Sequence, residues 1–280
     1  MAATRVVAVR AEEVFKQADG VLDLEDLEPV HDMRVATRRL RAALEVFASC
    51  FPPKRHRKAM KRVKRLADAL GARRDVDVEI GLLEGIVAEL DGDDHQAVER
   101  PLERMHSERQ EANAQLAAFV SGKRLPKLRR RLEKLAGSAR GMKARHVEGL
   151  APGDSLRTSA ARAVRTRLDE LHGFYEAALA PEASAVQHDM RIAAKRLRYV
   201  LETVGACLGA EAEPARRACK DLQSVLGHLH DCDLVLRRTE GIESATKLLR
   251  ERRERLFHEF VARWQAEASK GTWAALESTL

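Results

Sequence analysis

Aromatic and strand-forming residues are scarce in this sequence. Aromatic residues make up 4% of its 280 residues, whereas alanine, leucine, arginine and glutamate are abundant. The abundant residues favour helices, and aromatic and β-branched residues are those that favour strands. No segment alternates apolar and polar residues as a half-buried strand does. The composition therefore predicts an all-α fold.

Cysteines and long apolar runs are also few. The four cysteines (Cys50, Cys207, Cys219 and Cys232) are scattered through the chain, which argues against a small disulfide-rich domain and favours free thiols in a reducing cytosol. The N-terminal segment lacks the apolar core of a signal peptide. No apolar run approaches the roughly 18 residues that a membrane span needs. We therefore expect a cytoplasmic protein with no membrane partner.

The net charge is small for so many charged residues. The chain has 50 lysines and arginines against 43 aspartates and glutamates, and its net charge is +7 at pH 7. Charged residues make up 33% of the sequence, which exceeds the usual proportion of about a quarter. Where the positive charges lie is therefore more informative than their sum.

The chain contains an internal repeat. Residues 31–45 (HDMRVATRRLRAALE) return as residues 188–202 (HDMRIAAKRLRYVLE), with ten of fifteen positions identical. Further downstream, residues 66–77 match residues 222–233 after a slip of one position. We predict a tandem duplication with repeats at residues 1–150 and 151–280, joined within the glycine-containing stretch 137–153.

Each repeat carries the signals of several helices joined by short turns. Pro29 marks a helix start, Ser184 and Gln187 have capping-box spacing at the equivalent place, and Pro52 and Pro53 separate two helices. Helical periodicity covers residues 76–90, 98–120, 125–135, 156–179 and 244–268. Short connections favour an antiparallel helical bundle in each repeat.

Two glycines are expected to end helices. Gly71 and Gly227 resemble C-terminal caps, and Asp75 and Asp231 resemble N-caps of the helices that follow. This interpretation predicts a break in the third helix of each repeat.

The helix around His31 has two distinct faces at about 100° per residue. An apolar stripe, expected to be buried, comprises Met33, Ala36, Leu40, Ala43, Leu44 and Phe47. The opposite side carries His31, Arg34, Arg38 and Arg41. In the second repeat, His188, Arg191, Lys195 and Arg198 lie opposite Met190, Ala193, Leu197, Val200 and Leu201.

These basic rows lack the acidic residues that usually accompany them. Exposed helices interleave acids at three- and four-residue spacing, whereas each row has only Glu45 or Glu202 at its far end. A solvated basic face is the ordinary interpretation, but an uncompensated row that occurs twice favours a bound anion. Each row also includes a histidine, whose charge changes near a pH of about 6.5.

The next helix carries a longer basic run, with eight lysines or arginines and no acid in residues 54–65. The side opposite the apolar positions Ala59, Val63, Leu66 and Leu70 carries Lys54, Arg57, Lys58, Lys61, Lys64 and Arg65. The second repeat keeps Arg217 and Lys220 but replaces Arg62 and Arg65 by Ala218 and Asp221, so the ligand is expected to rely more on the first repeat. Rows of cations at helical rise suit a linear polymer of phosphates.

These motifs resemble the conserved histidine α-helical domain (CHAD) family. The resemblance rests on HxxRVxxRRLR at residues 31–41 and LGxxRDxDV at residues 70–78, which recur in the second repeat. It covers essentially the whole chain, so residues 1–280 are identified as a single CHAD-like domain. It implies two helical bundles related by a pseudo-twofold axis, and a basic central cavity that binds inorganic polyphosphate. It also implies a location at polyphosphate granules.

The resemblance places the polyphosphate site on the basic rows already named. Secondary candidates on the first helix of each repeat are Arg5, Arg10, Arg162 and Arg167. The replacement of Arg74 by His230 puts a shared role of these two positions in doubt. Arg39 and Arg196 lie off the rows and are expected to pair with the regions around Asp75 and Asp231.

Three other functions fit the sequence less well. A metal-dependent phosphohydrolase is suggested by the His–Asp dipeptides at 31–32 and 188–189, but adjacent helical residues point about 100° apart. A zinc site from Cys219, His228, His230 and Cys232 has no counterpart in the first repeat. Nucleic-acid binding is the main alternative because backbone phosphates offer similar contacts, yet no aromatic residue interleaves the basic rows. We predict non-catalytic binding without metal or cofactor; the oligomeric state stays open, and a monomer is compatible with the sequence.

Overall fold

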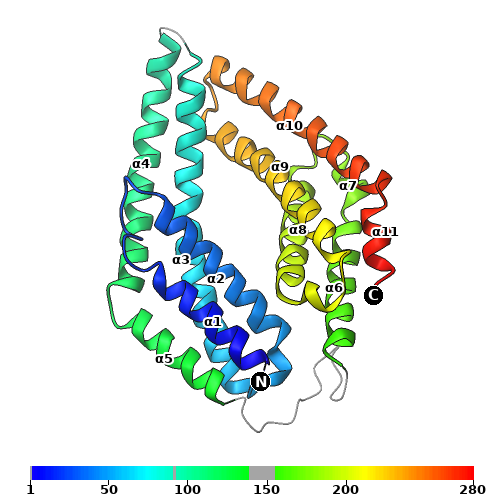
Figure 1. Cartoon of the computed structure of the whole chain (residues 1–280). Coiled ribbons are helices and arrows are strands. Elements are labelled where there is room, and N and C mark those ends of the chain that lie inside the picture. The colour runs from blue at the N-terminus through cyan, green and yellow to red at the C-terminus, as the bar shows by residue number, and fades with distance from the viewer. Residues whose placement is uncertain (1, 91–92, 139–154) are drawn as a thin grey trace. The chain divides into compact units, whose positions relative to one another are not determined.

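The computed structural model describes residues 2–90, 93–138 and 155–280, and all regular secondary structure in these ranges is helical (Figure 1). The all-α prediction is therefore confirmed. Among the described helices, none combines the length and the apolar character that crossing a bilayer requires. The predicted joint at residues 137–153 falls mainly on residues 139–154, which lie outside the described ranges.

The contacts divide the chain into two compact units. Unit 1 comprises Met1–Asp77 and Ser107–Ser155, and unit 2 comprises Val78–His106 and Leu156–Leu280. The long helices α3 (Pro53–Val87) and α4 (Asp93–Val120) contribute to both units, because the unit boundaries fall inside them. The repeat boundary at residues 150 and 151 stays a prediction.

Unit 1 is built around α1 (Ala2–Lys16), which packs on α2 (Glu28–Val46) and on α5 (Arg124–Gly137) (Figure 1). A short 3-10 turn, η1 (Ala48–Cys50), follows α2. Pro29 stands at the start of α2 and Pro53 begins α3, as predicted. The predicted apolar stripe of α2 is buried throughout, and so are the four apolar positions predicted for α3. The basic row of α2 and the lysines and arginines of residues 54–65 consequently lie away from the core.

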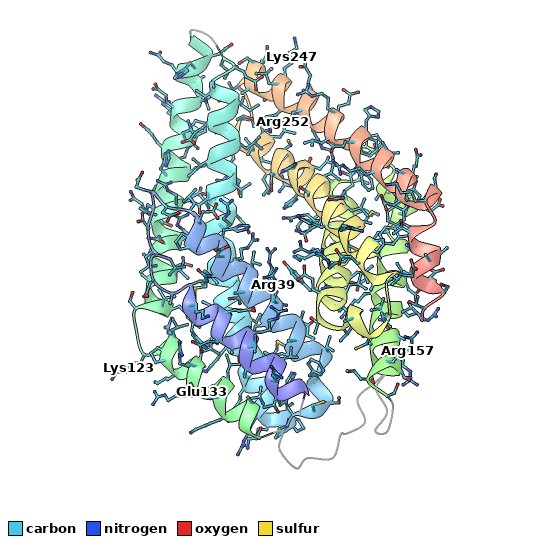
Figure 2. All side chains as sticks on the ribbon, in the orientation of Figure 1. Arg39, Lys123, Glu133, Arg157, Lys247 and Arg252 are labelled. Atoms are coloured by element: carbon cyan, nitrogen blue, oxygen red, sulfur yellow. The ribbon has the colours of Figure 1, made fainter. Side chains whose placement is uncertain are left out.

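Unit 2 is built around α8 (Ser184–Val204), which packs on α6 (Leu156–His172) and on α9 (Ala212–Arg238). The predicted apolar stripe of α8 is buried throughout. The remaining elements of the second half are α7 (Tyr175–Ala178), η2 (Gly205–Cys207), α10 (Glu243–Ser269) and α11 (Thr272–Glu277). Trp264 of α10 stacks on Tyr175 at 4.5 Å and on Trp273 at 5.5 Å between ring centroids, and Arg157 of α6 donates to the carbonyl oxygens of Cys207 and Thr279 (Figure 2).

The predicted helix breaks at Gly71 and Gly227 are wrong. Both α3 and α9 continue through their glycine, and neither glycine has a positive φ. Burial explains the continuity, because Ile80 in α3 and Leu229 in α9 extend the buried face beyond the glycine, and packing outweighs the helix penalty of glycine, about 1 kcal/mol. The lack of a side chain at Gly227 leaves room for Arg191, because a Cβ at this position would stand 3.4 Å from Nε of Arg191.

The capping box predicted at Ser184 is also wrong. Helix α8 does begin at Ser184, but no side chain caps it. The Gln187 side chain is buried and donates from Nε2 to the carbonyl oxygens of Ala178 and Ala180, at 3.2 and 2.9 Å. Its Oε1 accepts a hydrogen bond from Arg253 of α10 at 2.9 Å. Gln187 therefore ties α8 to the end of α7 and to α10, a long-range role that local spacing does not reveal.

A buried ion pair lies inside α3. Arg73 and Asp77 are one helical turn apart, their charged groups are in contact, and both side chains are fully buried. Buried charges are tolerated when they are paired. Asp77 of the LGxxRDxDV motif therefore has a structural partner in its own helix.

Candidate functional site

The basic row of α2 lies opposite its buried stripe. We call His31, Arg34, Arg38 and Arg41 the α2 stripe; all four are half-buried. The backbone of α2 places them on one side at intervals of about one turn. The neighbouring core fixes the helix, so the four side chains project from a rigid support.

Carboxylates offset part of the α2 stripe. Arg34 donates to Asp75 of α3 at 2.9 Å. Arg41 stands 3.9 Å from Glu45, and this contact is weak because the Glu45 carboxylate is exposed to water. The sequence identified Glu45 as an acidic residue beside this row but did not identify Asp75, because the contact of Asp75 with Arg34 joins α3 to α2. Asp75 is itself about half exposed, so an anion approaching Arg34 competes with a carboxylate that water already solvates.

His31 is held toward its neutral form. Burial lowers the pKa of the His31 imidazole, and the positive charges of Arg74 and Arg38 lower it further. The sequence predicted that Arg38 shares the row of His31, and the structure adds Arg74 of α3 to its surroundings. A bound anion would weaken the repulsion between these cations and favour the charged imidazole.

Helix α3 supplies the most exposed positive charge of unit 1. In residues 54–65, all the lysines and arginines are exposed except the half-buried Arg62. Among the described residues, none of these eight cations has an ion-pair or hydrogen-bond partner. The run is therefore uncompensated within the part of the chain that the structure describes.

The eight cations of α3 divide between two sides of the helix. Arg57 and Lys64 lie on the same side of α3 as Asp75, the partner of Arg34. Arg57 precedes Asp75 by about five helical turns, and Lys64 precedes it by about three. They extend the α2 stripe along α3. Lys58 and Arg65 lie on the side that faces α5, where they line surface hollows. The sequence placed all four on one broad face.

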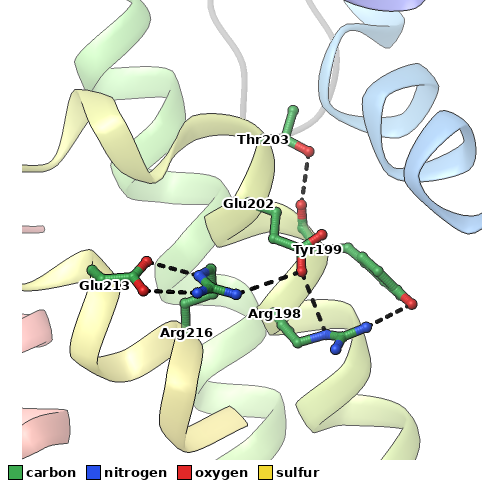
Figure 3. A network of polar contacts seen from close by, with 6 residues as sticks. All are labelled: Arg198, Tyr199, Glu202, Thr203, Glu213 and Arg216. Atoms are coloured by element: carbon green, nitrogen blue, oxygen red, sulfur yellow. Dashed lines mark hydrogen bonds and ion pairs between the residues drawn. The ribbon is translucent and has the colours of Figure 1, made fainter. Parts of the chain in front are cut away.

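The matching row of α8 in unit 2 is more heavily engaged. We call His188, Arg191, Lys195 and Arg198 the α8 stripe; all four are half-buried. Arg198 donates to the Tyr199 hydroxyl at 2.7 Å and stands 3.7 Å from Glu202. Figure 3 shows both contacts. Glu202 also contacts Arg216 of α9 at 3.9 Å. Carboxylates and a phenol therefore restrain the far end of this row.

A histidine pair marks the start of the α8 stripe. The rings of His188 and His230 lie 4.0 Å apart between centroids, tilted by 45°. Burial, with the positive charges of His188 and Arg191, lowers the pKa of His230 to about 4. His230 occupies the repeat position of Arg74, which lies close enough to His31 to lower its pKa. The replacement of Arg74 by His230 thus falls on a position that lies close to His31 in unit 1 and to His188 in unit 2.

Acidification is expected to destabilise the protein through His230. Its pKa of about 4 in the folded chain lies below the value of about 6.5 for an unfolded histidine. The unfolded chain therefore takes up the proton first, so the free energy of unfolding falls as the pH falls from about 6.5 toward about 4. Urea denaturation at pH 7 and pH 5 should show a smaller loss for His230→Gln than for the wild type. His258→Gln, at an exposed position, is the control, and an equal loss in all three proteins would contradict the expectation.

The remaining predicted residues differ in their exposure and in their ion pairs. Arg217 and Lys220 of α9 are exposed. Arg10 pairs with Glu13 at 2.8 Å, and Arg167 pairs with Glu170 at 2.7 Å at the equivalent place. Arg5 and Arg162 are exposed positions on α1 and α6. The pairing of Arg10 and Arg167 offsets their charge, which makes these two arginines poorer ligands for an anion.

The expected partner of Arg196 needs correction, whereas the pairing of Arg39 with the region around Asp75 stays a prediction. Arg196 donates to Glu170 of α6 rather than to the region of Asp231. Asp75 accepts a hydrogen bond from Arg34 of the stripe itself. The sequence missed both pairings because each joins two helices whose relative rotation is set by the core.

The residues of the suggested zinc site do not come together. Cys219 is fully buried whereas His228 is exposed, and on the single helix α9 they point about 180° apart. Within the described ranges, no group of three or more histidine, cysteine or acidic side chains is placed to hold a metal ion. The same observation gives no support to a metal-dependent site at the His–Asp dipeptides.

The chain matches a family model over most of its length and is similar in fold to solved structures. The family model of the CHAD domain matches residues 5–240. The fold is similar to the crystal structure of the CHAD domain from the plant Ricinus communis, with a TM-score of 0.63 and 20% identity, over 99% of this chain and 90% of that one. It is also similar to PptA from Streptomyces chartreusis, with a TM-score of 0.67 and 16% identity, over 98% of each chain. No curated protein matches the sequence.

Proposed function

The chain belongs to the CHAD domain family, and from this premise we propose that it binds inorganic polyphosphate through its basic helix faces without catalysing a reaction. Polyphosphate binding is a general property of the family. We further propose that the protein is located in the cytoplasm at polyphosphate granules. As the family resemblance implies, we also propose a basic central cavity as the place of binding.

The observation that carries this proposal is the uncompensated charge of α3 beside the α2 stripe. Arg57 and Lys64 are exposed and, among the described residues, have no carboxylate partner. They lie on the side of α3 that carries Asp75, the ion-pair partner of Arg34. Like charges on neighbouring helices repel one another, so an anion that neutralises them is stabilised by several cations at once.

Arginine and lysine suit a phosphate polymer in complementary ways. A guanidinium group donates two parallel hydrogen bonds to phosphate oxygens, and a lysine adds a mobile positive charge. Each charge-assisted hydrogen bond contributes about 1.5–3 kcal/mol net. In unit 2, the α8 stripe with Arg217 and Lys220 supplies a second face with fewer exposed charges. We therefore expect the first unit to contribute more of the binding energy.

Titration with long-chain polyphosphate and with duplex DNA of equal total charge tests the proposal. Polyphosphate is expected to bind more tightly, because the basic faces carry no exposed aromatic side chain for stacking and few polar groups for reading bases. By analogy with DNA, six or more phosphate contacts would weaken binding by about a thousandfold between 50 and 200 mM salt. Fluorescence anisotropy over this salt range measures both properties. Tighter binding of DNA, or no dependence on salt, would overturn the proposed ligand.

A further inference from the structure

A second basic surface lies between α3 and α5 in unit 1. One hollow is lined by Arg55 and Lys58 of α3 and by four cations of α5, and the adjoining hollow shares Lys58 and Arg131 with it. We call the two together the α3–α5 groove. Its basic residues are Arg55, Lys58, Lys61, Arg62, Arg65, Lys127, Arg130, Arg131 and Lys134. No acidic residue lines either hollow.

The core of α5 explains why its cations face the groove. Leu125, Leu128, Leu132 and Leu135 are buried at three- and four-residue spacing, so the cations between them point the other way. Arg129 is the exception: it pairs with Glu12 at 3.2 Å and lies over the ring of Phe15. This arginine fastens α5 to α1 and takes no part in the groove.

The charges of the groove are not offset. None of its nine cations has an ion-pair or hydrogen-bond partner in the part of the chain that the structure describes. Arg129, on the same short helix, shows that a neighbouring arginine does find a carboxylate when one is within reach. Nine unpaired cations facing one another across a groove repel, and a bound polyanion relieves that repulsion.

The shape and chemistry of the groove point to a linear phosphate chain. Arg55 and Arg65 are ten residues apart on α3, so at 1.5 Å per residue the groove extends roughly 15 Å. Apart from its cations, only Gly137 and Ser138 line it. Neither hollow of the groove is lined by an aromatic ring for stacking a base, although an adjoining hollow that shares Arg62 and Arg65 with the groove includes Phe119 and Asp68. A chain that consists only of phosphates needs no such ring.

We propose that the α3–α5 groove is a second binding site for linear inorganic polyphosphate, separate from the surface formed by the α2 stripe with Arg57 and Lys64. The choice of ligand rests on the proposed function, whereas the site rests on the groove itself. Lys58, Lys61 and Arg65 then belong to the groove rather than to the α2 side. One protein molecule holds two chains, or two segments of one chain, and a long polymer gains avidity by occupying both sites.

Calorimetric titration with a short linear polyphosphate of defined length tests this proposal. The wild type is expected to bind two chains. Reversing two groove charges (Lys58→Glu with Arg131→Glu) should leave one chain bound, and so should reversing two charges on the α2 side (Arg57→Glu with Lys64→Glu). The charge-conserving pair Lys58→Arg with Arg131→Lys should bind two chains, as the wild type does. Arg250→Glu with Arg255→Glu, at exposed positions of α10, carries the same charge change and should also bind two.

The outcomes separate the groove from the proposed function. If the wild type binds one chain, or if the groove variant keeps the wild-type stoichiometry and affinity, the groove is not a site although the proposed function stands. If no protein binds polyphosphate, the proposed function fails together with the ligand of the groove. If duplex DNA binds at the groove more tightly than polyphosphate, the proposed ligand class is wrong. Circular dichroism and thermal melting confirm that each variant is folded.

Discussion

Replacing Arg57 and Lys64 by glutamate is expected to weaken polyphosphate binding at the α2 side by about two to four orders of magnitude. Both side chains are exposed, and neither has a partner among the described residues, so the change should not disturb the fold. The loss of two charge-assisted contacts, at about 1.5–3 kcal/mol each, corresponds to this range of affinity. Titration in the background of Lys58→Glu with Arg131→Glu isolates the α2 side from the groove.

The matched control for this prediction is the pair Arg250→Glu and Arg255→Glu on α10. It changes the net charge by the same amount at exposed positions outside the proposed sites. If the control pair weakens binding as much as the α3 pair, only the total charge matters, and the assignment of α3 to the site is wrong. A selective loss supports a localised site.

Replacing Asp77 by alanine is expected to lower the free energy of unfolding by about 3–5 kcal/mol, because it leaves the Arg73 guanidinium buried without its counter-charge. Arg73 is fully buried, and Asp77 is its ion-pair partner. Urea denaturation followed by circular dichroism at 222 nm, a standard helix signal, measures the change. The variant should unfold at much lower urea concentration.

The double variant Arg73→Met with Asp77→Leu tests the cause of that loss. It removes both charges and fills the space with apolar side chains of similar volume, which is often neutral or stabilising for a buried pair. The double variant should therefore recover most of the stability that Asp77→Ala loses. A cost below about 1 kcal/mol for Asp77→Ala would show that Arg73 finds solvent or another partner.

The sequence predicts those features that depend on local spacing. The buried stripes containing Leu40 in α2 and Leu197 in α8 follow from helical periodicity, and both are buried in the structure. The repeat identified equivalent histidines and showed that His230 replaces Arg74. These predictions hold because one helix face is determined by the residues of that helix alone.

The sequence does not predict features that depend on which helices pack together. The continuity of α3 through Gly71 depends on the burial of Ile80 further along the helix. The ion pair of Arg34 with Asp75 joins two helices. The α3–α5 groove depends on the rotation of α5, which the sequence identified as a helix but did not place beside α3. In each case the missing information is a long-range contact.

Lysine footprinting tests most directly whether the basic faces hold phosphate. Acetylation of the folded protein, with and without long-chain polyphosphate, is followed by mass spectrometry for each lysine. We expect polyphosphate to protect Lys64 on the α2 side, Lys58 in the groove and Lys220 in unit 2, and to leave the exposed Lys16 and Lys247 reactive. Lys247 is labelled in Figure 2. Equal protection of Lys16 and Lys247, or no protection of Lys64, would contradict the account.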